Sequence, residues 1–296
     1  MKRTNPPPAD AAHPAGVLAA GGDASHRATL IFRLTTLCAL SAAAGGARRG
    51  AATVASPAPD LLVTVRTGTV SAPDSVAAGW LRLRVEEDGN GHILVVFRLP
   101  ESAIDSDVPG FLAALDTARA TPPPALALGG PEIGDTGEVV IQFTRGRYLL
   151  GCVTRGGDGH RHASTGEART IRVTEGASAA PRATVEVPMT EFAYVVPERW
   201  TAGSHMLRVE NRGRQDHQLR LARLRAGSTV TAWMNAEKPN EHAVPVAGVA
   251  RMGPGTVAYL PVELIPGRYI LFCLVPDPAT GRPHVTMGML RSIQID

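Results

Sequence analysis

Two imidazoles, one thiol and one thioether stand in the C-terminal part of the sequence, at His217, Cys273, His284 and Met289. His217 lies at a predicted strand end, and the other three lie near the C-terminus across one loop between two strands. Such a His₂Cys set with a weak thioether suits a mononuclear copper site for electron transfer, because thiolate favours Cu(I) and imidazole also satisfies Cu(II). Met287 is a second thioether candidate, although its spacing from His284 fits an axial ligand less well.

A second group of candidate ligands occupies the first half of the chain, at His92, Cys152, His162 and Glu167. Here a carboxylate replaces the thioether, and a hard carboxylate suits Zn²⁺ or Cu(II) better than rapid copper cycling. His160 adds another donor. The alternative is that this group is a decayed copy retained for packing.

Scattered acidic residues, with Asp74 and Asp88 as examples, are interpreted as solvated surface. The two cysteines of the candidate sites are expected to stay unpaired. Equivalent positions of tandem repeats usually lie beyond the reach of a disulfide, about 7 Å between Cα atoms. Metal binding or burial would then protect both thiols.

The candidate ligands belong to two halves that repeat one pattern. A Gly-Arg-Tyr triplet precedes each Cys at the same spacing, at 146–148 and at 267–269. The second His follows the Cys by ten positions in one half and by eleven in the other, and the last ligand follows five positions later in both. Upstream, 80–92 resembles 205–217, since each is an alternating strand followed by a turn and a His.

Regular short strands with Gly and Pro turns must position these residues, which predicts a β-sandwich or barrel. The expected strands are 80–87, 93–99, 137–143, 146–152 and 168–173 in the first half and 205–211, 218–224, 255–264, 267–273 and 290–295 in the second. A short helix is expected in each half, one starting at Asp107 or Pro109 and one capped by Ser228. We therefore predict an all-β chain of two tandem Greek-key sandwich domains, at 60–174 and 182–296.

Composition excludes several classes of protein. The chain has 296 residues with 31 Gly and 24 Pro, and its net charge of +3 is too balanced to indicate nucleic-acid binding. No Gly-rich phosphate loop stands between a strand and a helix, and no uncharged apolar run is long enough to span a membrane. No Ser/His/Asp arrangement and no zinc-protease helix motif offers a catalytic route.

Residues 1–59 are interpreted as a signal-like segment and linker. The stretch 28–47 is apolar and ends in small residues, as secretory signals do, although Arg33 interrupts it. A single membrane anchor is the alternative, which Arg33 and the short span disfavour. Leu37 before Cys38 argues against lipid attachment, since such sites require a small residue there. We expect an exported protein, periplasmic or extracellular, with no membrane span in the mature chain.

The C-terminal motifs resemble those of the cupredoxin, or blue copper, family. The resemblance rests on N-x-G-x-x-x-H at 211–217, the strand Tyr-Ile-Leu-Phe-Cys at 269–273 and the His-to-Met spacing at 284–289. It covers residues 182–296 and extends more weakly to 60–174. It implies a Greek-key sandwich of seven or eight strands that binds one copper ion in the C-terminal domain, with a second metal in the first domain as a further option.

Two departures from the family pattern stand out. Ten residues, 274–283, separate Cys273 from His284, where small blue copper proteins have two to four; copper nitrite reductases also have a long gap. Gln218 follows the first His where the family often has Asn, which questions the hydrogen bond that locks this loop but not the ligand. The long loop is expected to shape a partner surface or to shield the site.

The resemblance implies single-electron transfer to a redox partner protein. A copper storage or delivery module, with a copper donor or acceptor as its partner, is one alternative. A metal-free cupredoxin-like scaffold of the cell envelope is the other. Enzyme activity is not expected. Multicopper oxidases and nitrite reductases need a further copper centre fed by several His-x-His pairs or interdomain His, and this sequence has one such pair, at 160–162.

Overall fold

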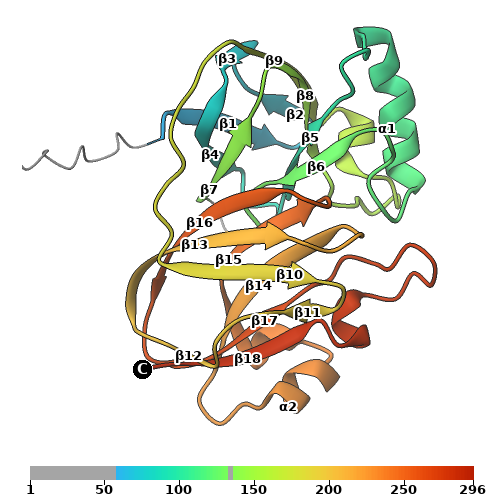
Figure 1. Ribbon diagram of the computed structural model, residues 1–296. Coiled ribbons are helices and arrows are strands. Elements are labelled where there is room, and N and C mark those ends of the chain that lie inside the picture. The colour runs from blue at the N-terminus through green and yellow to red at the C-terminus, as the bar shows by residue number, and fades with distance from the viewer. Residues whose placement is uncertain (1–57, 133–135) are drawn as a thin grey trace, which may run out of the picture. The chain divides into compact units, whose positions relative to one another are not determined.

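The computed structural model describes residues 58–132 and 136–296 (Figure 1). The predicted signal-like segment lies outside the described residues. Within them the chain is built mainly of strands, and the predicted all-β class with a short helix in each half is confirmed. None of the described helices has the length and apolar character needed to cross a membrane.

The first half contains nine strands in its described residues and a helix, α1, at Val108–Thr117. The strands are β1 (Asp60–Arg66), β2 (Thr69–Ser71), β3 (Ser75–Ala77), β4 (Gly79–Glu87), β5 (Leu94–Arg98), β6 (Leu126–Gly129), β7 (Thr136–Phe143), β8 (Gly146–Cys152) and β9 (Ala168–Thr174). A short 3₁₀ helix, His162–Thr165, connects the last two strands.

The second half repeats this order of elements around helix α2 at Val230–Asn235. Its strands are β10 (Val185–Thr190), β11 (Ala193–Tyr194), β12 (Arg199–Trp200), β13 (Gly203–Asn211), β14 (His217–Leu224), β15 (Ala243–Met252), β16 (Val257–Leu264), β17 (Gly267–Phe272) and β18 (Leu290–Ile295). The 3₁₀ helix His284–Met287 again connects the last two strands.

The strands form two sheets, and each sheet contains strands from both halves. One has the order β11-β10-β13-β16-β7-β4-β1-β2, and the other β12-β18-β17-β14-β15-β6-β5-β8-β9-β3. Antiparallel pairing of β7 with β16 and of β6 with β15 joins the halves. Residues 53–296 group as one compact unit, so the division into two domains at 175–183 stays a prediction.

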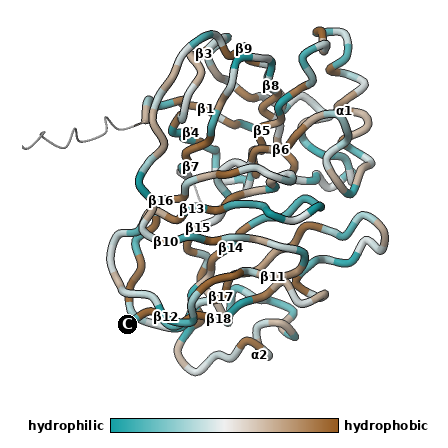
Figure 2. The backbone as a smooth tube through the Cα atoms, in the orientation of Figure 1, coloured by the Kyte–Doolittle hydropathy of each residue, from teal (hydrophilic) through white to brown (hydrophobic). Residues whose placement is uncertain are grey.

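Alternating side chains explain why the sheets pack on each other. In β4 the residues Leu81, Leu83 and Val85 are buried while their neighbours face outward, as expected for a strand with one covered face. They share one core with Leu150 and Leu271 from the other sheet. The hydrophobic stretches fall largely on the strands (Figure 2), which is the pattern of a sandwich.

Two expectations about the helices and strands need correction. Thr229, not Ser228, caps α2: its backbone is extended and its hydroxyl accepts the amide of Ala232 at 3.0 Å. At α1 both expected start residues lie at the beginning of the helix: Asp107 is the N-cap residue and Pro109 lies in the first turn, although the Asp107 carboxylate accepts the amide of Ile104 and none of α1. Eight strands of the described residues were not among those expected from the sequence: β1, β2, β3, β6, β10, β11, β12 and β15.

Candidate metal centre

The structure brings together His217, Cys273 and His284 of the second half. Their ligand atoms all lie within 4.8 Å of one another. The two Nδ1 atoms are 3.1 Å apart, and the Sγ of Cys273 lies 3.5 Å from Nδ1 of His284. All three side chains are fully buried, as is Met289, whereas Met287 is only half-buried. Three of the four predicted ligands therefore converge on one buried point.

Backbone hydrogen bonds hold the last two predicted ligands beside the cysteine. The amide of Met289 donates to the carbonyl of His284 at 3.0 Å, and the amide of Cys273 donates to the carbonyl of Met289 at 3.3 Å. Gly288, at φ 106°, makes the left-handed turn between them. The backbone of Met289 is therefore held next to both His284 and Cys273 by the conformation of the loop.

A buried asparagine fixes the loop that carries His217. The amide nitrogen of Asn211 donates to the carbonyls of Gln215 and Met252, both at 2.8 Å, and its oxygen accepts the amide of Gly213 at 2.9 Å. The sequence placed the loop-locking hydrogen bond at position 218 in question. In the structure the hydrogen bonds of Asn211, at the start of the loop, hold the loop instead.

Gln218 has a different place in the structure. Its backbone amide donates to Sγ of Cys273 at 3.4 Å, and its side chain donates to Glu132 at 3.3 Å. An N–H directed at the sulfur favours thiolate. Burial nonetheless raises the pKa of Cys273 to about 12, although hydrogen bonds from the backbone amides of Gln218 and Val275 lower it.

Burial also keeps the imidazoles neutral. It lowers the pKa of His217 to about 4, with a further contribution from His284, and lowers that of His284 as well. Neutral imidazole is the metal-binding form, and the thiol releases its proton when a metal binds.

The donor set fits copper. Donors held about 2.0–2.3 Å from one ion lie about 3.3–3.8 Å from each other, and the measured separations of 3.1 and 3.5 Å are close to this. Soft sulfur with two imidazoles is the set that accommodates both copper oxidation states. The described cysteines, Cys152 and Cys273, are both free and buried, as expected from the sequence.

The long loop 274–283 folds over the site. It closes on itself where the amide of Asp277 donates to the carbonyl of Arg282 at 2.9 Å, and Arg119 of the first half donates to Pro278 at 3.5 Å. Gln215 bridges loop and ligand, since its oxygen lies 3.1 Å from Nε2 of His284 and its nitrogen donates to Asp277 at 3.2 Å. The ring of His284 is fully buried, and Phe192 also packs against it, with ring centroids 5.1 Å apart.

The four predicted ligands of the first half also converge. Nδ1 of His92 lies 3.4 Å from Nδ1 of His162, and Sγ of Cys152 lies 3.6 and 3.7 Å from these two atoms. Oε2 of Glu167 lies 2.8 Å from His92 and 3.1 Å from His162. His160 is not part of this group, because it is exposed and pairs with Asp116 at 2.7 Å.

The contacts of two residues beside the ligands were missed. Asp88 is exposed, as expected for solvated surface, and its carboxylate also lies 3.1 Å from Nε2 of His92, a contact that was not predicted from the sequence. Its position four residues before a candidate ligand was the available signal. Gln215 carried no comparable signal, because its contact with His284 spans 69 residues. Burial raises the pKa of Cys152 to about 11.

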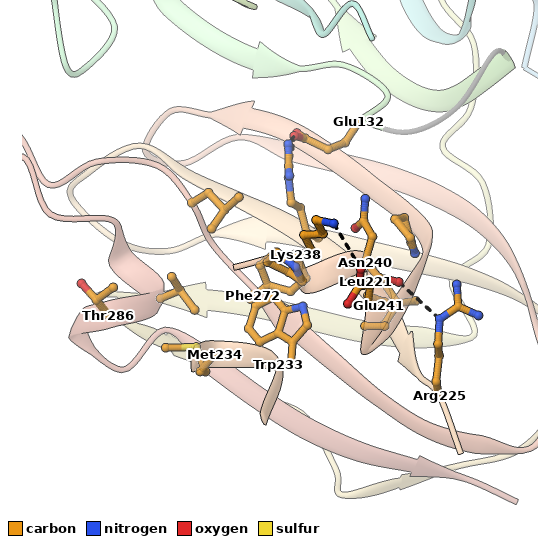
Figure 3. A pocket seen from close by; sticks show the side chains of 17 residues that line it. Glu132, Leu221, Arg225, Trp233, Met234, Lys238, Asn240, Glu241, Phe272 and Thr286 are labelled. Carbon is orange, nitrogen blue, oxygen red and sulfur yellow. Dashed lines mark hydrogen bonds and ion pairs between the residues drawn. The ribbon is translucent and has the colours of Figure 1, made fainter. Parts of the chain in front are cut away.

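A groove of 1050 Å³ lies on the outer side of strand β17. Figure 3 shows Trp233 and Phe272 side by side in it, and their ring centroids are 4.6 Å apart. Phe272 directly precedes Cys273, and Val285 of the same groove directly follows His284. Trp233 of α2 forms one hydrophobic cluster with Phe272 and Val285, so this packing supports the strand and the turn that carry two ligands.

Comparisons with known proteins return copper proteins among the solved structures. No known family model matches the sequence, and no curated protein matches it. A reduced auracyanin from Roseiflexus castenholzii is 19% identical, with a TM-score of 0.29, over 40% of this chain and 99% of its own. A multicopper oxidase is 12% identical, with a TM-score of 0.24, over 80% of this chain and 88% of its own. Copper nitrite reductase from Nitrosomonas europaea is 11% identical, with a TM-score of 0.23, over 80% and 93%.

These neighbours belong to the classes of protein that the sequence resemblance names, and some of them are enzymes. At such low identities and TM-scores, nothing about metal or activity passes from them to this chain. The roles of the candidate ligands stay predictions, and they depend on the side chains described above.

Proposed function

We propose that the chain binds one copper ion through His217, Cys273, His284 and Met289 and carries single electrons. The observation that supports this is the convergence of one thiol and two neutral imidazoles at a fully buried point. Bound copper would supply a one-electron couple between Cu(I) and Cu(II). A single mononuclear centre exchanges one electron, which fits a carrier and not an oxidase.

The protein's own contribution is a rigid, dry frame. His217 and Cys273 lie at the ends of adjacent strands, β14 and β17, that pair antiparallel, so the distance between them is fixed by the sheet. Asn211 fixes the approach to the first ligand, and the second ligand, His284, is fully buried. A site that cannot relax changes little in geometry when its charge changes, which favours rapid electron transfer.

The burial of the ligands favours electron transfer over copper storage or delivery. A delivery site must open for ligand exchange, whereas here all three converging ligands are fully buried, and Asp277 of the 274–283 loop accepts a hydrogen bond from Gln215 beside His284. Gln215, in contact with His284, is half-buried and offers the path from the site towards the surface. The partner we propose is an exported redox protein that docks near Gln215, in the periplasm or outside the cell.

A visible spectrum tests the proposal. Full-length protein loaded with Cu(II) should show an intense thiolate-to-copper band with one copper in the second half. The Cys273→Ser variant should lose this band, and the matched Cys152→Ser variant should keep it. Absence of a thiolate–copper band in Cys152→Ser protein, where Cys273 is the one thiol left among the described residues, would contradict the proposal.

A further inference from the structure

We infer that the first half holds a second metal ion, a divalent Zn²⁺, in a closed site formed by His92, Cys152, His162 and Glu167. This inference is independent of the copper proposal, because the two groups share no residue. The competing interpretation is a decayed copy retained for packing, which would bind no metal.

The donor separations match those of one four-coordinate ion. Donors about 2.0–2.3 Å from a common ion lie about 3.3–3.8 Å apart. The His92–His162, Cys152–His92 and Cys152–His162 separations are 3.4, 3.6 and 3.7 Å, and the two contacts of Glu167 are slightly shorter. A closed set of four protein ligands with sulfur and imidazole is the pattern of structural zinc sites.

The hydrogen bond to Asp88 determines which nitrogen of His92 faces the site. The Asp88 carboxylate accepts from Nε2 at 3.1 Å, which leaves the lone pair on Nδ1. That lone pair is directed at the sulfur of Cys152 and the carboxylate of Glu167, which are both electron-rich. A cation bound between Nδ1 of His92, the sulfur of Cys152 and the carboxylate of Glu167 would offset the repulsion among these electron-rich atoms. The carboxylate–histidine–metal arrangement is the usual outer contact of a metal-binding histidine.

The charge of the donors selects a divalent ion. A thiolate from Cys152 and a carboxylate from Glu167 together carry two negative charges, whereas Cys273 and Met289 carry one. Glu167 is fully enclosed, and its other oxygen, Oε1, accepts the amide of Gly68 at 3.0 Å, so Oε2 is the atom turned to the site. Isolated buried carboxylates are costly unless a cation compensates them. Copper(I) would leave one negative charge uncompensated here.

A buried guanidinium preorganises the loop that carries His162. Arg161 donates to the carbonyls of Leu115 and Val153, both at 2.9 Å, and to that of Ala118 at 3.2 Å. These bonds tie helix α1 and strand β8 to the residue next to the ligand. Such positioning lowers the entropic cost of gathering four ligands.

The test uses full-length Cys273→Ser protein, in which the only described thiol is that of Cys152. Titration with Co²⁺ should give one thiolate-to-cobalt band per chain, and Zn²⁺ should displace the cobalt with a stoichiometry of one. Zn²⁺ affinity is then measured by competition with a chromophoric chelator. Adding Cys152→Ser should remove the cobalt band.

Glu167→Gln keeps the side-chain volume and removes one charge, so we expect Zn²⁺ affinity to fall by at least about tenfold while circular dichroism stays unchanged. The matched control, Glu175→Gln, changes an exposed carboxylate paired with Arg145 and should leave the affinity unchanged. If either variant were misfolded, unmodified protein should still gain thermal stability on adding Zn²⁺.

Three results would overturn the inference. One is the absence of a thiolate-to-cobalt band in Cys273→Ser protein, and another is Zn²⁺ affinity that Glu167→Gln does not change. The third is tighter binding of copper(I) than of Zn²⁺ in the Cys273→Ser protein. None of these bears on the copper band of Cys273, so failure here is distinguishable from failure of the proposed function.

Discussion

The two candidate sites have the same backbone frame but different side chains. In each, the last ligand donates its amide to the second histidine and accepts the amide of the cysteine. The bonds are Glu167–His162 and Cys152–Glu167 in one half, at 2.9 and 3.0 Å, and Met289–His284 and Cys273–Met289 in the other, at 3.0 and 3.3 Å. The frame therefore places the ligands alike in both halves, and we propose that one side chain, Glu or Met, sets the metal that each site prefers.

The surroundings of the sites differ as well. His162 has 22% of its side chain exposed, whereas His284 is fully buried beneath its loop. His92 has a carboxylate, Asp88, on its outer nitrogen, whereas Nε2 of His217 is buried without a hydrogen-bond partner among the described residues. One histidine of the first site is thus partly open to solvent and another contacts an outer carboxylate, whereas the converging ligands of the second site are all enclosed.

The largest expected difference between the halves concerns the residue that fixes the first ligand loop. Asn211→Ala leaves three buried backbone groups unpaired and should lower the free energy of unfolding by about 3–5 kcal/mol. Its counterpart Glu87 is half-buried and accepts only the amide of His92, so Glu87→Ala should cost about 1 kcal/mol. Chemical denaturation of both variants measures this. Equal losses would show that the two loops are fixed alike.

A pH titration of stability probes the buried histidine of the second half. The pKa of His217 falls to about 4 in the folded protein, below its unfolded value of about 6.5. The unfolded chain therefore binds more protons between these values, and stability should decrease as pH falls from about 6.5 to 4, by up to about 3 kcal/mol. Metal-free His217→Gln protein should lack this portion of the pH dependence. Parallel profiles for the two proteins would contradict it.

Two glycines sharpen the comparison of the turns before the last ligands. Gly166 and Gly288 have φ of 121° and 106°, so alanine strains the backbone at both. A Cβ at Gly166 would also lie 2.8 Å from the carbonyl oxygen of Gly68, whereas at Gly288 the nearest atom is 4.0 Å away. We expect Gly166→Ala to cost about 2–3 kcal/mol and Gly288→Ala about 1 kcal/mol, as measured by denaturation. A larger loss at Gly288 would show that the loops differ in more than their side chains.

The sequence predicted the elements that repeat locally and the residues they carry. Strand ends before His217 and Cys273 follow from alternation and turn residues, and the common spacing of the two halves predicted both groups of ligands. It did not predict that β6 pairs with β15 across the two halves, because that pairing joins residues more than a hundred positions apart. Gln215 was missed for the same reason, since a hydrogen bond across a folded loop leaves no local periodicity.

The smallest effect tests whether one side chain sets the metal preference. Met289→Glu gives the second site the donor charge of the first, which should stabilise Cu(II) over Cu(I) by at least about tenfold, or about 59 mV in reduction potential. In Met289→Gln the new side chain has the shape of Glu but no charge, so the potential should shift less than in Met289→Glu. Comparing the two variants separates the effect of the charge from that of losing the thioether. Voltammetry on copper-loaded protein measures both. Because the frame around position 289 matches that around Glu167, an unchanged potential in Met289→Glu would mean that the surroundings, such as Asp88, and not the last ligand, distinguish the two sites.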